Sequence, residues 1–278
     1  MATAHRLAAN RFDLIRLALA SAVFAYHAIV LSALAPMSGL ERAWGHVAEI
    51  AIQGFFIVSG ALVAGSLVRS QSLADYAGKR VRRLYPAYAA VILIPALISL
   101  LMGGTVGGVA EYVGANLVFL NFLSPDLPGL FEDNRFTEVN GALWTLKIEV
   151  MFYLCLPIIG WILRRTGRAQ WIVLVALYAA GEAWRHYVPV LLDHPLAPVL
   201  ARQLPGQMAF FASGIALWLV WDLAKSKPLW FGAAGLALAL LSALHPWLEP
   251  LRGAGLAGLI ACAAFLPGPA LNVARFGD

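Results

Sequence analysis

The chain has 278 residues, of which 61% are hydrophobic and only 13% are charged, and its mean hydropathy is +0.76. A soluble globular chain is typically about 45–50% apolar and about 25% charged. The composition therefore argues against a soluble protein and indicates a polytopic membrane protein. The net charge of +5 is no sign of nucleic-acid binding, because membrane proteins carry basic residues in their loops, and we expect no nucleic-acid partner. The two cysteines, Cys155 and Cys262, lie in apolar runs without metal-ligand spacing, so we expect no metal site.

The apolar runs predict an all-α fold, a polytopic transmembrane helical bundle of about eight crossings. The predicted spans are 12–34, 45–68, 86–103, 142–163, 169–188, 204–222, 228–245 and 251–267. The segment 111–123 is apolar but short, which predicts a re-entrant, interfacial or marginal helix. The segment 71–85 has mixed charge and predicts an amphipathic helix at the membrane surface.

The distribution of basic residues predicts the orientation of the bundle. The polar, basic start of the chain lacks a convincing cleavage site, so we expect a retained first helix with a cytoplasmic N-terminus. If 111–123 does not cross, fourteen lysines and arginines fall in cytoplasmic segments and five in outer ones, as the positive-inside rule requires. The outer segment 124–141 is then acidic and long enough to shape a site.

The first predicted span carries two ionisable side chains in the stretch "RLALASAVFAYH". Arg16 and His27 are eleven residues apart, which places them on one helical face about 16 Å apart along the axis. Asp13 lies one turn before Arg16 and can pair with it. A structural explanation exists for each residue. Arg16 can be an interfacial anchor whose side chain snorkels to the membrane surface, and His27 can form an interhelical hydrogen bond. An intramembrane histidine is also a candidate proton acceptor.

Two further motifs lie in the second span and just after it. In "GFFIVSG", 54–60, small residues let a neighbouring backbone approach, which ordinary helix packing also explains. In "KRVRRLYPAY", 79–88, four cations in five residues precede Tyr85 and Pro86. Such a cluster suits phosphates, although attraction to anionic lipid headgroups would produce it as well.

A fourth motif, "NGALWTLKIEVMFYL", 140–154, places Lys147 and Glu149 inside an otherwise apolar span. An ionised carboxylate in a membrane needs a partner. The candidates are Lys147, Tyr153 one turn further on, or a residue of another helix such as His27. A purely structural ion pair is the alternative.

Together these motifs resemble the integral-membrane acyltransferase 3 family of bacteria, whose members are O-acyltransferases. The resemblance covers residues 12 to about 160 closely. The matching residues are Arg16 and His27, then Phe55, Phe56, Ser59 and Gly60, then Arg80, Arg82, Tyr85 and Pro86, and finally Leu143, Trp144, Glu149, Phe152 and Tyr153. Lys147 and Val150 depart from the family pattern. Family members usually continue beyond a closing "GD" to about ten helices. The resemblance therefore implies that residues 1–278 form a single integral-membrane domain that lacks its last two helices.

The resemblance also implies a reaction: transfer of an acyl group, most often acetyl, from acyl-coenzyme A to a hydroxyl of a carbohydrate or other cell-envelope acceptor. We expect no permanently bound cofactor, acyl-coenzyme A as the donor substrate, and a location in the bacterial inner membrane. The implied catalytic residues are His27 and Glu149, and the implied donor-binding residues are Arg16, Arg80, Arg82 and Arg83. Substrate-binding or structural roles are implied for Asp13, Phe56, Ser59, Gly60, Tyr85, Trp144, Lys147 and Tyr153.

Two other kinds of protein remain compatible with the sequence. A transporter or flippase without covalent chemistry also carries intramembrane charges and a broken short helix. A lipid-binding scaffold is the third interpretation, although it leaves His27 unexplained. The identity of the acceptor, the acyl chain and the oligomeric state stay open.

Overall fold

The computed structural model describes residues 11–32 and 38–266, and within these ranges it contains helices and no β-strand. The fold class predicted from the sequence is therefore confirmed for the described part of the chain. The expectations about positions 33–34, about 267 and about the closing "RFGD" fall outside the described residues.

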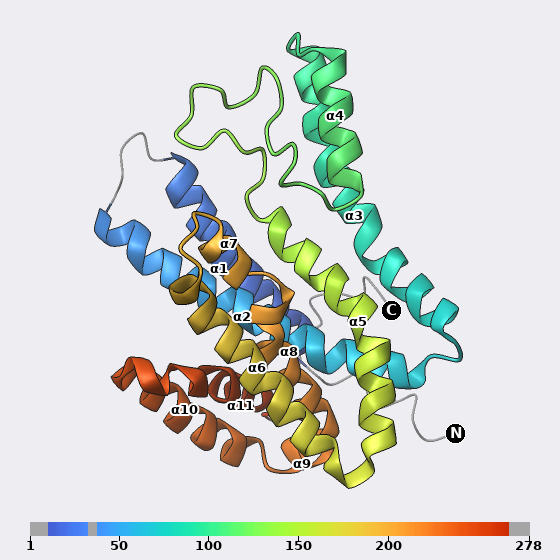
Figure 1. The fold of residues 1–278 in the computed structure, drawn as a ribbon, viewed down its shortest axis with the longest axis vertical. Coiled ribbons are helices and arrows are strands. Elements are labelled where there is room, and N and C mark those ends of the chain that lie inside the picture. Colours follow the sequence, from blue (N-terminus) through green and yellow to red (C-terminus); the bar gives the residue numbers. More distant parts are fainter. Residues whose placement is uncertain (1–10, 33–37, 267–278) are drawn as a thin grey trace.

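The helices follow one another with short connections, except for a long loop between α4 and α5 (Figure 1). Their bounds are α1 Phe12–Ser32, α2 Ser38–Arg69, α3 Leu73–Leu101, α4 Val106–Leu117, α5 Leu143–Thr166, η2 Gly167–Ala169, α6 Gln170–Leu191, α7 Ala197–Ala201, α8 Leu204–Leu219, α9 Trp221–Ser226, α10 Pro228–Leu244, η3 Pro246–Leu251 and α11 Arg252–Phe265.

Several helices are long and apolar enough to cross a membrane, so the protein is a multi-pass membrane protein. By length and composition there are five such stretches in the described part of the chain, namely Phe12–Val30, Gly39–Arg69, Leu73–Leu101, Leu143–Leu191 and Pro246–Phe265. The stretch Leu143–Leu191 contains both α5 and α6, which reverse direction around Gly167 (Figure 1). Gly167 has a positive φ of 54°, a conformation that glycine adopts without steric cost. The count of eight crossings stays a prediction.

The structure differs from the prediction at α3, where the expected surface helix 71–85 and span 86–103 form one helix. The Ser72 side chain caps its start by accepting a hydrogen bond from the Asp75 backbone amide. Pro86 and Pro95 lie inside the helix and do not end it, because transmembrane helices tolerate proline where neighbouring groups satisfy the freed carbonyls. The short apolar helix also shifts, since α4 begins at Val106 after the capping residue Thr105 and ends at Leu117.

The core lies where α2 crosses α8. A Cβ atom added to Gly60 would meet the Phe211 carbonyl oxygen and would lie 3.1 Å from the Gly214 Cα atom, so the two backbones are in direct contact there. The aromatic ring of Phe211 stacks on Phe152 of α5, with centroids 3.9 Å apart. Small residues thus bring α2 and α8 together, and aromatic side chains fill the space beside their crossing.

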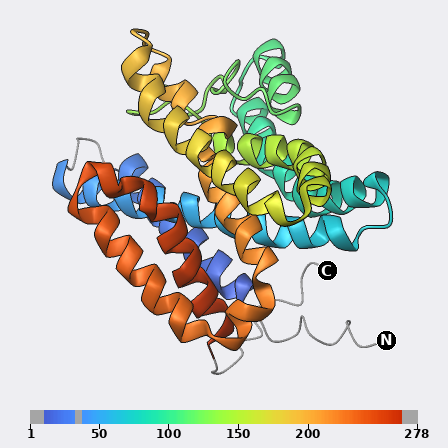
Figure 2. The same ribbon diagram turned by 60° about the horizontal axis from the view of Figure 1, so that its bottom comes forward.

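Two groups of helices flank this core (Figures 1 and 2). On one side α10 and α11 pack closely along Gly235, Gly255 and Gly258. On the other side α3 and α4 stand apart and share a second apolar cluster with the loop that follows α4, around Tyr88 and Tyr112. The first half of α3 carries the basic motif and contacts α2 and α5, and Leu143 at the start of α5 joins the second apolar cluster.

Candidate functional site

Glu149 of α5 is the centre of a polar cluster between helices. One of its carboxylate oxygens, Oε1, accepts a hydrogen bond from the Ser59 hydroxyl of α2 and another, at 2.5 Å, from the Tyr153 hydroxyl one turn further along α5. Ser59 is only 6% exposed. Among the partners considered from the sequence, Tyr153 is therefore present, and Ser59 is added to it. The contact also gives Ser59 a role besides the close packing of its neighbour Gly60.

Tyr153 connects this carboxylate to the basic end of α3. The Tyr76 hydroxyl donates to the Tyr153 backbone carbonyl at 3.1 Å, and the Arg80 guanidinium lies 5.8 Å from the centre of the Tyr153 ring. Arg80 Nη2 also donates to the Ser66 hydroxyl of α2 at 3.0 Å. Arg80 Nε is buried and has no hydrogen-bond partner among the described residues. The contact with Ser66 therefore orients this guanidinium between α2 and α5.

Arg16 of α1 lies close enough to Glu149 for the carboxylate charge to act on it. Its predicted pairing with Asp13 is present, with 3.5 Å between Nη1 and Oδ1. Besides Asp13, the charges that act on its guanidinium are those of Arg83 and Glu149. We refer to the group formed by Arg16, Ser59, Ser66, Arg80, Glu149 and Tyr153 as the Glu149 cluster.

The remaining cations of the basic motif lie beside the Glu149 cluster. Lys79 is paired with Asp75 at 2.7 Å, so it is engaged within its own helix. The side chains of Arg82 and Arg83 are exposed. The motif thus presents Arg80 toward α2 and α5 and presents Arg82 and Arg83 outward.

His27 lies at the other end of α1. Helices α1 and α2 run antiparallel, because Leu19 packs against Gly54 while Tyr26 packs against Gly45. Eleven residues separate Arg16 from His27, a rise of about 16 Å. Among the described residues no hydrogen bond joins His27 to Glu149. The carboxylate is therefore at the level of Arg16 and not at the level of the imidazole.

The imidazole of His27 has a defined orientation. Its Nδ1 atom lies 2.8 Å from the Val23 carbonyl oxygen, and the ring lies 5.3 Å from the Tyr26 ring between centroids. A carbonyl can only accept a hydrogen bond, so Nδ1 carries the proton in the neutral ring. Nε2 is then the basic nitrogen, which is the requirement for accepting a proton from a substrate.

The other residues singled out from the sequence make packing contacts. The Phe56 ring lies 4.8 Å from Phe211, and Trp144 packs against the main core. The Tyr85 hydroxyl donates to the Leu117 carbonyl at 3.4 Å, and the Lys147 ammonium lies 5.2 Å from the Phe122 ring centre. No group of three side chains in the described ranges could hold a metal ion.

Two residues at this site were not identified from the sequence. Ser66 belongs to the Glu149 cluster, and Tyr76 contacts it through the Tyr153 backbone carbonyl. Ser66 follows Ser59 by seven residues, which is two helical turns, so the two hydroxyls share a face. This spacing was a usable signal. Tyr76 carries no such signal, because its contact depends on how α3 packs against α5.

A polytopic helical bundle with a carboxylate, guanidinium groups and an imidazole between its helices belongs to the class of membrane enzymes and transporters. Comparison with known proteins decides between these two. Residues 10–272 match the family described as the acyltransferase domain of the acyltransferase 3 type. The chain belongs to this family, and it is a membrane-embedded O-acyltransferase.

Two relatives support the assignment. Nodulation protein 10 of Rhizobium leguminosarum bv. viciae is 31% identical over 290 residues, which cover 94% of this chain and 78% of that protein. An O-acetyl transferase of Shigella phage Sf6 is 33% identical over 156 residues, which cover 52% of this chain and 44% of that protein. No solved structure matches the chain. The resemblance inferred from the motifs is thus confirmed.

Proposed function

We propose that the protein transfers an acyl group, with acetyl as the expected one, from acyl-coenzyme A to a hydroxyl of a carbohydrate or other cell-envelope acceptor. The observation that carries the proposal is the arrangement along α1, with a cluster of arginines around Glu149 at one end and the imidazole of His27 at the other. In this proposal the protein lies in the bacterial inner membrane with its N-terminus and the basic end of α3 on the cytoplasmic side, where acyl-coenzyme A is found.

The arginines are suited to the donor. Coenzyme A is polyanionic, and guanidinium groups bind phosphate oxygens through paired hydrogen bonds. Arg82 and Arg83 are exposed at the end of α3, and the Nε atom of Arg80 lacks a partner in the described part of the chain. Arg16 adds a fourth cation to the same end of the bundle. The thioester arm of the donor would then extend along α1 toward His27.

His27 would act at the acceptor. Its Nε2 atom takes the proton of the acceptor hydroxyl while the oxygen bonds to the thioester carbonyl carbon. The carbon–sulfur bond breaks, and the thiolate of coenzyme A leaves and takes up the proton from the imidazolium. A transient acyl-histidine is the other route by which His27 could serve. Glu149 balances the charge of Arg16 and holds Ser59 and Tyr153, so we assign it a positioning role.

The central test is acyl transfer from labelled acetyl-coenzyme A in membranes that contain the protein. His27→Ala should lower ester formation by about 100-fold or more, as expected for loss of a general base. Arg80→Ala should raise the KM for acetyl-coenzyme A more than it lowers kcat. Arg165→Ala is the matched control, because Arg165 stacks on Trp161, with 4.9 Å between guanidinium and ring centre, and belongs to no part of the Glu149 cluster.

Two results would contradict the proposal. If His27→Ala formed the ester at the wild-type rate, the imidazole would have no role in the reaction. Absence of any labelled ester with the wild-type protein would favour a transporter without covalent chemistry.

A further inference from the structure

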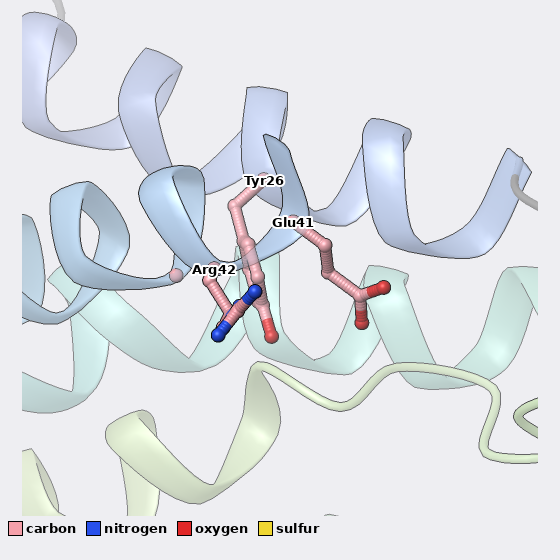
Figure 3. A pocket seen from close by; sticks show the side chains of 4 residues that line it. Tyr26, Glu41 and Arg42 are labelled. Carbon is pink, nitrogen blue, oxygen red and sulfur yellow. The ribbon is translucent and has the colours of Figure 1, made fainter. Parts of the chain in front are cut away.

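A pocket of about 440 Å³ opens at the His27 end of α1 and is lined by Tyr26, Glu41, Arg42 and Gly45. Figure 3 shows that the side chains of Tyr26 from α1 and of Glu41 and Arg42 from the first turns of α2 extend to the same side of the two helices. Gly45 leaves space for the Tyr26 ring, whose Cε2 atom would lie 3.6 Å from a Cβ atom at this position. The volume falls within the range of about 300–1,000 Å³ that is usual for small-molecule sites.

The long loop between α4 and α5 contacts one of the residues that line this pocket. Arg135 of the loop donates from Nη1 to Glu41 Oε2 at 3.0 Å, and its guanidinium lies 4.8 Å from the Phe136 ring centre. Only one oxygen of Glu41 takes part in this hydrogen bond. The other oxygen, Oε1, can accept hydrogen bonds from a ligand.

The lining groups fit a hydroxyl-rich ligand. A carboxylate accepts hydrogen bonds from hydroxyl groups, a guanidinium donates to hydroxyl and ring oxygens, and an aromatic ring packs against the apolar face of a sugar. Glu41 is paired with Arg135 and Arg42 also lines the pocket, so charges of both signs are present here, whereas arginines dominate the end of α1 and α3 about 16 Å away along α1. The pocket therefore differs in chemistry from the proposed donor end.

We propose that this pocket binds the acceptor, a neutral carbohydrate unit, and presents one of its hydroxyl groups to His27. The inference rests on the proposed function, because it takes His27 as the base. The geometric link is the Tyr26 ring, which lines the pocket and lies 5.3 Å from the His27 ring between centroids. A sugar ring packed on Tyr26 is thus a neighbour of the imidazole.

The first experiment measures binding without the donor. Purified full-length chain in lipid nanodiscs is applied to an array of immobilised neutral saccharides from bacterial envelopes. Wild-type protein should bind a subset of these saccharides. Glu41→Gln should weaken binding at least tenfold, because it removes the ion pair with Arg135 and one strong acceptor.

Gly45→Val supplies a second variant that does not depend on charge. Its added methyl groups should narrow the pocket and weaken binding at least tenfold as well. Gly39→Val is the matched control on the same helix, since a Cβ atom at Gly39 meets nothing within 4 Å, and it should bind as wild type does. Failure of the wild-type protein to bind any neutral saccharide would overturn the proposal, and so would binding by Glu41→Gln and Gly45→Val that is as tight as binding by the wild type.

A second experiment separates this inference from the proposed function. Labelled acetyl-coenzyme A is added to the same array, and ester formation on the bound saccharides is measured. Saccharide binding without ester formation by the wild type would reject the proposed function and leave the pocket in place. Ester formation with the same acceptor KM in wild type, Glu41→Gln and Gly45→Val would reject the pocket and leave the proposed function in place.

Discussion

At the scale of single residues, the environment of Glu149 explains how a carboxylate is tolerated between membrane helices. Oxygen Oε1 accepts two hydroxyl hydrogen bonds, from Ser59 and Tyr153, and the carboxylate charge acts on Arg16. Each hydrogen bond to a charged group contributes about 1.5–3 kcal/mol. The two hydrogen bonds therefore offset part of the free-energy cost of removing the carboxylate from water. The remaining cost is offset by the charge of Arg16 on α1.

Glu149→Gln separates these two contributions. The amide oxygen can still accept from Ser59 and Tyr153, but the negative charge opposite Arg16 is lost. We expect the variant to fold and to lose at least about tenfold in kcat/KM, since about 1.4 kcal/mol of lost interaction corresponds to a factor of ten. Acetyl-coenzyme A–dependent ester formation and the thermal midpoint in detergent measure the two effects.

Ser59→Ala is the companion variant, because it keeps the charge and removes one hydrogen bond. It should reduce activity less than Glu149→Gln does. A larger loss in Ser59→Ala would mean that the hydroxyl, and not the charge, is the important group.

At the scale of helices, the crossing of α2 and α8 determines where the Glu149 cluster forms. Gly60 follows Ser59 directly, so the contact that brings α2 against the Phe211 carbonyl and Gly214 also fixes the Ser59 hydroxyl opposite α5. A shift of α2 along α8 would separate Ser59 from Glu149. Packing and site geometry therefore depend on the same short segment.

Gly60→Ala tests this dependence. The added methyl group has no room against the backbone of α8, and overpacking of this kind typically costs about 1–3 kcal/mol. Gly114→Ala in α4 is the control, since nothing lies within 4 Å of its Cβ position, and it should be neutral or stabilise by about 0.5–1 kcal/mol. Denaturation midpoints of the two variants in detergent check the difference, and equal midpoints would show that the α2–α8 contact is looser than described.

The helix pattern also shows what could be predicted from the sequence. Apolar runs identify most of the long helices within a few residues, because burial in lipid requires about twenty apolar residues in succession. The same rule fails at α3, where the mixed charge of 71–85 suggested a surface helix separate from the span that starts at Pro86. Proline breaks helices in water, but its effect in a membrane bundle depends on neighbouring groups that the local sequence does not contain.

The candidate site was predictable in part for a related reason. Asp13 and Tyr153 were identified because their partners lie one turn away on the same helix. The contact between Ser59 and Glu149 spans 90 residues, and the absence of a direct bond from Glu149 to His27 follows from the antiparallel register of α1 and α2. The register between two helices depends on tertiary packing, so it cannot be predicted from the spacing of residues along one helix.

At the scale of the whole molecule, the basic loops predict the orientation in the membrane. The connection around Gly167 follows Arg164 and Arg165 and should face the cytoplasm, whereas Asp133 in the loop before α5 should face outward. Gly167→Cys and Asp133→Cys, each in a chain with Cys155 and Cys262 replaced by alanine, can be labelled in intact cells with a membrane-impermeant maleimide.

We expect labelling of Asp133→Cys in intact cells and labelling of Gly167→Cys only after the membrane is opened. The reverse pattern would place the arginines on the side that lacks acyl-coenzyme A. Labelling of both positions from one side would mean that α5 does not cross.

The rise of about 16 Å along α1 between Arg16 and His27 also determines what has to enter the hydrocarbon during a turnover of the proposed reaction. Coenzyme A carries its charge on phosphates, and moving such a charge into a low-dielectric medium is far more costly than moving an uncharged ester. With guanidinium groups at one boundary and the imidazole near the other, the phosphates can stay in contact with water while only the thioester arm is inserted. The acyl group would then change compartments while its carrier does not, and the free energy of the thioester itself would drive that passage.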